Sequence, residues 1–320
     1  MPKQGLFGRE TGGCLRGKQG LFPTQWSIHC RFITIFSTIN GAMDYRELCR
    51  ELVGSYDERE ARAVVMWLLE VAFGLTPTDV LCGALDRLAD GQRLQLRGMM
   101  DRLRAGEPVQ YVAGVADFGP RQFVVRPGVL IPRPETYELC QWVVADSVSA
   151  AAEADVLDIG TGSGCIAVTL ALALTRAHVT AWDVSPAALE IARNNAKIND
   201  SIVSCELCDA LCPPADEARW DIVVSNPPYI CECERKDMEP RVLEHEPSLA
   251  LFVPDNDPQR YYRAIGRYAM KALKPGGRLF FELNAAYAAD TRSMLEAMGY
   301  GCVELRDDQF GRPRFIKAMI

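Results

Sequence analysis

The loop at residues 225–229 has the sequence Ser-Asn-Pro-Pro-Tyr and follows an apolar run at 220–225 that is typical of a buried strand. Two consecutive prolines fix the backbone dihedral φ and remove two hydrogen-bond donors, which predicts a rigid loop. Rigidity suits methyl transfer to a planar nitrogen, because the lone pair of an amide is delocalised into the carbonyl and must be aimed at the incoming methyl group. We expect such a site to work by positioning and electrostatic preorganisation, without a strong general base.

Each residue of this loop has a predicted task. The side-chain oxygen of Asn226 and the backbone carbonyl of Pro227 are the predicted acceptors for the two N–H groups of an amide or amino group, and Tyr229 is predicted to pack against that planar group. The predicted catalytic residues are therefore Asn226, Pro227 and Tyr229, and Pro228 joins them as a predicted substrate contact. A merely structural turn is the alternative, since Asn-Pro alone is common in turns.

A glycine-rich loop precedes this motif in the chain. An apolar run at 156–159 leads directly into Gly160-Thr161-Gly162-Ser163-Gly164, and a helical pattern follows at once. Glycine is needed where φ is positive and where a ligand lies against the backbone. The Gly-x-Gly-x-Gly spacing, with Asp158 two residues before it, favours S-adenosylmethionine over a dinucleotide, whose loop has the spacing Gly-x-Gly-x-x-Gly. We predict that this cofactor binds to Gly160, Thr161, Gly162, Ser163 and Gly164.

Two acidic residues lie at the predicted ends of the next two strands. Asp183 ends the run at 178–183, where a carboxylate can accept hydrogen bonds from both ribose hydroxyls of an adenosine. Asp209 lies at the matching position after the third strand and is predicted to reach the adenine amino group. An isolated Asp at a strand end is often only solvated, but the nearby glycine loop favours binding. Asn226 is predicted to contact the cofactor as well as the substrate.

The chain after residue 154 alternates strand-like and helix-like segments, which predicts an α/β fold with a mostly parallel sheet and helices on both faces. A Gly/Pro-containing link near residue 312 predicts that the last two strands form an antiparallel pair. Seven strands are predicted at 155–159, 178–183, 202–207, 220–225, 277–283, 302–306 and 314–319. Helices are predicted at 163–174, 186–197, 258–273 and 287–298.

Three regions precede this α/β domain, which we place at 132–320. Residues 43–108 have a helical period, with a cap at Asp57, and predict a small N-terminal helical domain for substrate recognition. Residues 109–131 predict a linking β-hairpin with strands at 110–114 and 122–125 around a Gly-Pro turn.

Residues 1–42 differ from the rest of the chain, being rich in glycine and basic side chains without a sustained period. We predict a disordered extension that is either a targeting peptide or translated upstream sequence. Upstream sequence is favoured, with Met43 as the start of the functional protein.

The charge distribution bears on the class of partner. The net charge is −7, and residues 1–42 carry five basic side chains and one acidic one, which leaves about −11 for the rest. A nucleic-acid-binding protein usually needs a basic surface to neutralise phosphates, so we predict no direct contact with nucleic acid. No apolar run approaches the roughly 18 residues of a membrane span. We expect a cytoplasmic enzyme without membrane contact that works as a monomer.

The sequence contains 12 cysteines. Reduced thiols are the expected state in an enzyme of this size without an evident secretion signal. Two groups lie near the predicted strand ends, and a zinc or redox role is the alternative for them. Their spacing matches no zinc pattern, so we predict no metal and treat them as small buried or loop thiols. The groups are Cys205, Cys208 and Cys212, and Cys231 and Cys233.

Together these motifs resemble class I methyltransferases that act on exocyclic or amide nitrogen, and within these the release factor glutamine methyltransferase family. Three further stretches fit that family: Gly-Glu-Pro-Val-Gln-Tyr at 106–111, Leu-Ile-Pro-Arg-Pro-Glu-Thr at 130–136 and Glu-Pro-Ser-Leu-Ala-Leu at 246–251. The resemblance covers about residues 45–319. It implies a Rossmann-like class I methyltransferase fold with S-adenosylmethionine as cofactor. It also implies N5-methylation of the Gln in the Gly-Gly-Gln motif of peptide chain release factors, which the helical domain contacts.

The resemblance also concerns individual residues. A sister family that methylates a ribosomal protein on Gln shares Asn-Pro-Pro-Tyr but lacks Arg-Pro-Glu-Thr at 133–136, and family analogy implies that Arg133 and Glu135 line the substrate side of the pocket. This chain departs from the family at Asn284, where Gly is common, at Tyr287, where Gln is common, and at Ala210, often aromatic. These departures concern the adenine side and leave the methyl-transfer motif untouched.

Other classes of function remain as alternatives at this point. Nucleic-acid methyltransferases that modify exocyclic amines share the Asn-Pro-Pro-aromatic pattern, but they need base flipping and a basic surface. A glutamine methyltransferase for a ribosomal protein is the nearer alternative. A binding module without activity is disfavoured, because no motif between the glycine loop and the Asn-Pro-Pro-Tyr loop is disrupted.

Overall fold

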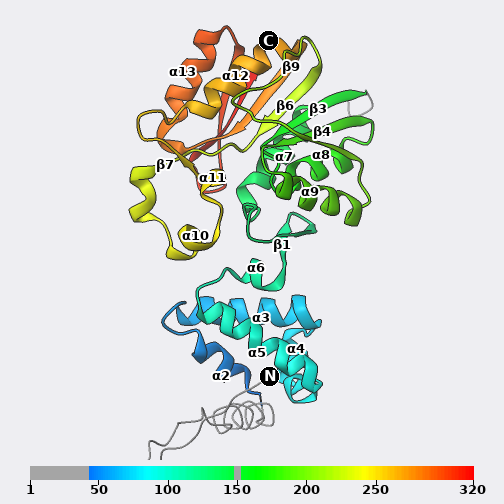
Figure 1. Cartoon of the computed structure of the whole chain (residues 1–320), viewed down its shortest axis with the longest axis vertical. Coiled ribbons are helices and arrows are strands. Elements are labelled where there is room, and N and C mark those ends of the chain that lie inside the picture. Colours follow the sequence, from blue (N-terminus) through cyan, green and yellow to red (C-terminus); the bar gives the residue numbers. More distant parts are fainter. Residues whose placement is uncertain (1–42, 148–152) are drawn as a thin grey trace, which may run out of the picture.

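The computed structural model describes residues 43–147 and 153–320, and a helical part and an α/β part follow one another along the long axis (Figure 1). The predictions for residues 1–42 lie outside this range. None of the helices in the described ranges is long and apolar enough to cross a membrane.

The first part is a bundle of helices, as its periodicity predicts. Asp57 accepts a hydrogen bond from the backbone N–H of Glu60 at 2.8 Å and so caps α3 (Glu58–Phe73), which ends at Gly74 with a φ of 67°. Buried leucines from several helices form its core, among them Leu68 and Leu103. The other helices are α2 (Tyr45–Glu51), α4 (Pro77–Leu81), the 3-10 helix η1 (Ala84–Arg87) and α5 (Asp90–Arg104).

The linker differs from its prediction in one element. The hairpin exists, with β1 (Val115–Phe118) antiparallel to β2 (Arg121–Val124) around the predicted turn. The strand predicted at 110–114 is wrong, because this segment is the short helix α6 (Val109–Ala113). Pro108 begins that turn and Gly114, with a φ of 79°, ends it. Alternating apolar residues fit a single helical turn as well as a strand, so periodicity could not separate the two.

Asn195 of α9 (Pro186–Ile198) attaches this hairpin to the α/β part. Its side chain is fully buried and pairs with both backbone groups of Val124, accepting from the N–H at 2.7 Å and donating to the carbonyl at 2.9 Å. The same amide donates to the carbonyl of Ser163 at 2.8 Å. A single side chain therefore provides hydrogen-bond partners for backbone groups of both β2 and the glycine loop.

The α/β part contains a seven-stranded sheet in the order β10-β11-β9-β6-β3-β4-β5. Strands β5, β4, β3, β6 and β9 are parallel, and β11 is antiparallel to both β9 and β10, as predicted for the final pair. The strands are β3 (Ala154–Ile159), β4 (Ala177–Asp183), β5 (Val203–Leu207), β6 (Trp220–Ser225), β9 (Leu273–Glu282), β10 (Gly301–Asp307) and β11 (Pro313–Met319).

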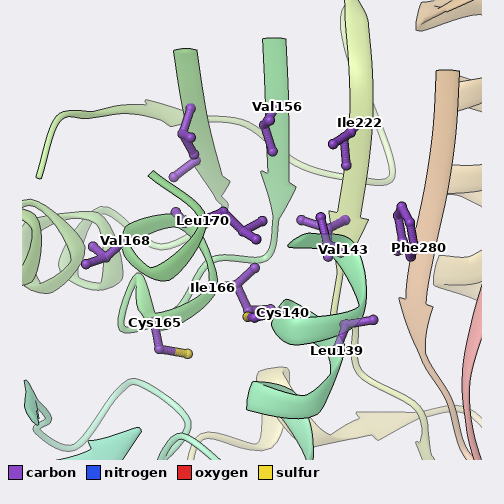
Figure 2. Close-up of a cluster of buried hydrophobic side chains, with 14 of the residues drawn as sticks. Leu139, Cys140, Val143, Val156, Cys165, Ile166, Val168, Leu170, Ile222 and Phe280 are labelled. Atoms are coloured by element: carbon purple, nitrogen blue, oxygen red, sulfur yellow. The ribbon is translucent and has the colours of Figure 1, made fainter. Parts of the chain in front are cut away.

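Helices cover both faces of this sheet. On one face, α7 (Pro134–Asp146) and α8 (Cys165–Ala173) pack their apolar side chains against β3, β6 and β9, where Val143 approaches Val156, Ile222 and Phe280 (Figure 2). The other face is covered by α12 (Arg260–Ala272) and α13 (Ala288–Met298). Because both faces are buried there, the inner parallel strands β3 and β6 consist of nearly continuous apolar runs, whereas the edge strand β5 is largely exposed.

The segment between β6 and α12 has structure that the sequence did not predict. It contains β7 (Ile230–Cys231), the 3-10 helix η2 (Glu232–Asp237), α10 (Pro240–His245), α11 (Ser248–Leu251) and β8 (Phe252–Val253). In Figure 1, α10 lies on the side of the α/β part that faces the helical part. Arg241 of α10 pairs with Glu60 of α3 at 2.9 Å and lies 4.0 Å from the ring centre of Tyr56.

Replacing Asn195 by Ala tests the attachment of the hairpin. We expect the free energy of unfolding to fall by about 2–3 kcal/mol, because backbone groups of Val124 and Ser163 lose their partner in a buried place. Urea denaturation measures this change. The control is Asn194→Ala, one position along the same helix, where the side chain is not fully buried. Equal effects of the two substitutions would contradict the assigned role of Asn195.

Candidate functional site

A cavity of about 500 Å³ lies outside the carboxyl ends of β3, β4, β5 and β6. Strand β3 has β4 on one side and β6 on the other, so the order of the sheet reverses here. Open α/β sheets bind their ligands at such a reversal. The remaining walls come from residues 128–130 of the linker, from the α11 segment and from α12.

The glycine loop at the end of β3 contributes two of its five residues to the cavity wall. Gly160 and Gly162 line the cavity with φ values of 76° and 54°, and a Cβ at either position would meet no protein atom within 4 Å. Glycine is therefore required here by the backbone, and the space beside it is left open. At Gly164 a Cβ would lie 3.0 Å from the Cβ of Ala192, so this glycine permits α8 to pack against α9.

Thr161 and Ser163 are buried and do not line the cavity. The hydroxyl of Thr161 donates to Oδ2 of Asp158 at 2.6 Å, which holds the loop against the end of its strand. Like Gly164, these two residues do not contribute to the cavity wall, whereas Gly160 and Gly162 do. Their predicted contact with the cofactor remains a prediction, whereas their structural role is visible.

Asp158 is fully buried beneath the loop. Burial raises the pKa of its carboxyl to about 7, against the lowering effect of hydrogen bonds from Thr161 and from the backbone N–H of Ala167. Its Oδ1 has no hydrogen-bond partner among the described residues. A raised pKa is the expected response of a carboxyl in such a place, because burial penalises its charged form.

Asp183 lies at the end of β4 and lines the cavity. Its Oδ2 accepts from the backbone N–H of Gly162 at 2.9 Å, and its Oδ1 accepts from that of Ser185 at 2.8 Å. Burial raises its pKa, while these backbone hydrogen bonds lower it. Each carboxylate oxygen keeps a further lone pair for a ligand hydroxyl. Asp209 also lines the cavity and accepts from the N–H of Leu211 at 2.8 Å.

Asn226, Pro227 and Pro228 line the cavity beside the glycine loop. The hydroxyl of Ser225, at the end of β6, donates to the carbonyl of Ile159 at 2.6 Å and joins the two strand ends. The amino group of Asn226 donates to Oγ1 of Thr136 at 3.1 Å. The side-chain oxygen of Asn226 has no partner within residues 43–147 and 153–320, and it is available to a ligand.

Tyr229 does not line the cavity. Its hydroxyl donates to Oε1 of Glu282 at 3.0 Å, and its backbone carbonyl accepts from Asn284 at 3.1 Å. Burial and the neighbouring Glu282 raise the pKa of the phenol, which keeps it a donor. In this arrangement Tyr229 holds the loop from behind, and its predicted packing against the substrate remains a prediction.

Arg133 and Glu135 are also outside the cavity wall. Arg133 pairs with Oε1 of Glu246 at 2.5 Å, and this carboxylate, only 1% exposed, also accepts from the backbone N–H of Ile131 at 3.1 Å. The pair joins the start of α7 to the segment before α11. The implied role of Arg133 and Glu135 toward the substrate is not visible in this structure and remains a prediction.

Residue-by-residue reasoning assigned no role to Thr136, Glu282 or Glu246, although each lies in a stretch that the family resemblance quotes or borders. The signal available was their polarity inside apolar or rigid segments. A glutamate at the end of a buried strand requires a partner, and Glu282 finds two.

The three departures from the family have different positions. Only Ala210 lines the cavity. Asn284 donates to the carbonyl of Tyr229 and to Glu234, and the Tyr287 hydroxyl lies 3.4 Å from Sγ of Cys231. Asn284 therefore holds the Asn-Pro-Pro-Tyr loop from behind, and Tyr287 contacts Cys231, which lies after that loop. The expectation that Asn284 and Tyr287 affect the adenine side is not supported by their position, since neither lines the cavity.

The cysteines have separate environments. Cys208 lines the cavity, Cys231 is buried, and Cys212 and Cys233 are exposed. Within the described part of the chain no three His, Cys, Asp or Glu side chains gather in a way that could hold a metal ion.

The residues of the cavity fit S-adenosylmethionine. The volume of the cavity lies within the range of about 300–1,000 Å³ that small-molecule sites occupy. The open space at Gly160 and Gly162 admits a ligand against the backbone, and Asp183 offers acceptors for ribose hydroxyls. Tyr261 of α12 supplies an aromatic side chain to the wall to which Ala210 also belongs.

Comparison with known proteins also indicates a methyltransferase. The model of the PrmC N-terminal domain matches residues 45–114, and that of the Methyltransferase small domain matches residues 141–245. A release factor glutamine methyltransferase of Bacteroides thetaiotaomicron is 42% identical over 264 residues, which are 82% of this chain and 94% of that protein. One of Flavobacterium psychrophilum is 37% identical over 86% of this chain and 97% of that protein.

The chain belongs to the release factor glutamine methyltransferase family. It is an S-adenosylmethionine-dependent methyltransferase with the class I fold, as its motifs predict. Among solved structures, a methyltransferase from Pyrococcus furiosus aligns with a TM-score of 0.46 and 18% identity over 62% of this chain and 87% of that one.

Asp183→Ala tests the cofactor side of the site. We expect the Kd for S-adenosylmethionine to rise about 10- to 100-fold, because the ligand loses charge-assisted hydrogen bonds and Gly162 loses its acceptor. Isothermal titration calorimetry measures the Kd. The control is Glu190→Ala, an exposed acid on the following helix, which should bind as the wild type does. Unchanged affinity in Asp183→Ala would mean that the ribose lies elsewhere.

Proposed function

We propose that this enzyme methylates the side-chain amide nitrogen, N5, of the Gln in the Gly-Gly-Gln motif of peptide chain release factors. Relatives that carry this activity in their name match the chain over most of both sequences, and the N-terminal match includes the helical part. The observation that carries the proposal is the orientation of Asn226. Its amino group is turned to Thr136, so an acceptor oxygen is left beside the cofactor cavity.

An amide substrate needs that acceptor. When bound, S-adenosylmethionine supplies a methyl group on a positively charged sulfur. Asn226 Oδ1 and the carbonyl of Pro227 accept the two N–H groups of the substrate amide and hold the nitrogen so that its lone pair faces the methyl carbon. Transfer of that methyl group would form the N–C bond and break the S–C bond of the cofactor, and the nitrogen would give up one proton to solvent. Positioning accounts for the catalysis, in keeping with the rigid Pro-Pro backbone.

The partner is a protein in this proposal. The negative charge of the chain beyond residue 42 disfavours a nucleic-acid strand as substrate. The helical part, which matches the PrmC N-terminal domain, is the proposed contact for the release factor. We infer that the enzyme acts as a monomer in the cytoplasm, where translation terminates.

One assay separates this proposal from methylation of nucleic acid or of another protein. Enzyme and radiolabelled S-adenosylmethionine are incubated with a release factor, with its variant carrying Ala in place of the Gln, with ribosomal protein or with total nucleic acid. We expect label on the intact release factor alone, because only it presents the amide. Label on nucleic acid, or undiminished label on the Ala variant, would contradict the proposal.

Asn226→Ala tests the acceptor itself. We expect kcat to fall by about 100-fold or more, the scale seen when one preorganised hydrogen-bonding group is lost. The Kd for S-adenosylmethionine should stay within about threefold, because Gly162 and Asp183 are untouched. Single-turnover kinetics and calorimetry measure the two quantities. If kcat stays near that of the wild type, Asn226 does not hold the amide.

A further inference from the structure

Three side chains from separate parts of the fold form a hydrogen-bonded chain, which begins at Asn226 in the Asn-Pro-Pro-Tyr loop and continues through two buried residues. Asn226 Nδ2 donates to Thr136 Oγ1 at 3.1 Å, and the Thr136 hydroxyl donates to Glu282 Oε2 at 2.6 Å. Thr136 is 3% exposed and Glu282 is 2% exposed. They belong to the first turn of α7 and to the last residue of β9, whereas Asn226 follows β6.

The direction of this chain follows from the chemistry of its last member. An ionised carboxylate only accepts hydrogen bonds. Glu282 therefore takes the single proton of the Thr136 hydroxyl, and Thr136 can only accept from its other neighbour. That neighbour must then present its amino group, which is the arrangement found at Asn226. An Asn amide in the reversed orientation would place its oxygen against the Thr136 oxygen, without a proton between them.

We propose that Thr136 and Glu282 are positioning residues that fix the orientation of the Asn226 amide, so that its oxygen faces the substrate. This inference rests on the proposed function, because an oriented acceptor is needed for an amide or amino substrate. Neither residue touches the cavity. They act through Asn226, Thr136 from α7 and Glu282 from β9.

Glu282 also holds the far end of the same loop. Its Oε1 accepts from the hydroxyl of Tyr229 at 3.0 Å, so one carboxylate is linked directly to Tyr229 and, through Thr136, to Asn226. The titratable or charged groups that interact with it include Glu135 and the Cys140 thiol on α7, the Cys165 thiol on α8, Tyr229 after β6, Tyr262 on α12 and Arg314 on β11. Burial raises its pKa, and the hydrogen bonds from Thr136 and Tyr229 and the charge of Arg314 lower it.

Thr136→Val and Thr136→Ser test the proposal at nearly constant volume. We expect Val to lower kcat on the release factor about 30-fold or more, with KM and the Kd for S-adenosylmethionine within about threefold, and Ser to restore kcat to within about fivefold of the wild type. The control is Thr291→Val, a fully buried and hydrogen-bonded threonine on α13, which should retain kcat. A general packing defect would change the two Val variants alike.

Glu282→Gln gives a second measurement, which does not depend on Thr136. A neutral amide can donate to Thr136 and so permits the reversed Asn226, as does a protonated Glu282. At saturating substrates the kcat of the wild type should therefore fall as pH is lowered through the pKa of Glu282. Glu282→Gln should have a lower kcat without that acidic limb.

The outcomes are distinct. Suppose that the wild-type enzyme methylates the release factor. The positioning role is then overturned, and the proposed function stands, if the kcat of Thr136→Val is within about threefold of the wild type or if Glu282→Gln keeps the acidic limb of the pH profile. A wild-type enzyme that leaves the release factor unlabelled overturns the proposed function and this inference with it. If Thr136→Val fails to bind S-adenosylmethionine, the Glu282→Gln profile decides.

Discussion

The site depends on the parallel pairing of β3 with β6, in which Ile159 is opposite Ser225. This register brings the glycine loop and the Asn-Pro-Pro-Tyr loop to the same edge of the sheet, although the two strand ends are 66 residues apart in the sequence. The hydroxyl of Ser225, donating to the carbonyl of Ile159, fixes the pairing at its last residue. A shift of β6 by one residue against β3 would turn the side chains of β6 to the opposite face and separate the cofactor wall from the acceptor.

Around that pairing, the two loops are made rigid in different ways. The glycine loop is held from below by Asp158 through Thr161, from the side by Asp183 through Gly162, and from α9 by Asn195 through Ser163. The Asn-Pro-Pro-Tyr loop gains stiffness from its prolines and from partners behind it. The polar groups of both loops that face the protein are thereby satisfied, and those that face the cavity stay available. Such preorganisation lowers the cost of ordering groups when a ligand binds.

Much of this could be predicted from the sequence, because the signals are local. Strand and helix patterns after residue 154, the cap at Asp57 and the antiparallel final pair all follow from short-range periodicity and turn residues. Of the predicted cofactor residues, Gly160, Gly162, Asp183, Asp209 and Asn226 meet around one cavity. The helix at 109–113 was missed because one helical turn and a short strand share the same apolar alternation.

What the sequence could not predict depends on pairing across the fold. Thr136 and Glu282 are 146 residues apart, and Asn195 and Val124 are 71 apart. No periodicity in the sequence marks such pairs, since each member fits the helix, strand or linker in which it lies without reference to the other. The short helices between β6 and α12 were missed for the same reason, because they are held by distant residues such as Arg133 and Glu60 more than by their own propensity.

That segment also explains how the two parts of the molecule are joined. Arg241 of α10 contacts Glu60 and Tyr56 of the helical part, while Leu249 and Ala250, a few residues on, form part of the cavity wall. Between them, the buried carboxylate of Glu246 pairs with Arg133 and with the backbone of Ile131. The Glu246 carboxylate is buried and both of its oxygens have partners, so it tolerates little displacement, because losing one partner leaves its charge without solvation. The segment that forms this cavity wall therefore contacts both the linker and the helical part. A partner bound to the helices would find this part of the cavity already positioned.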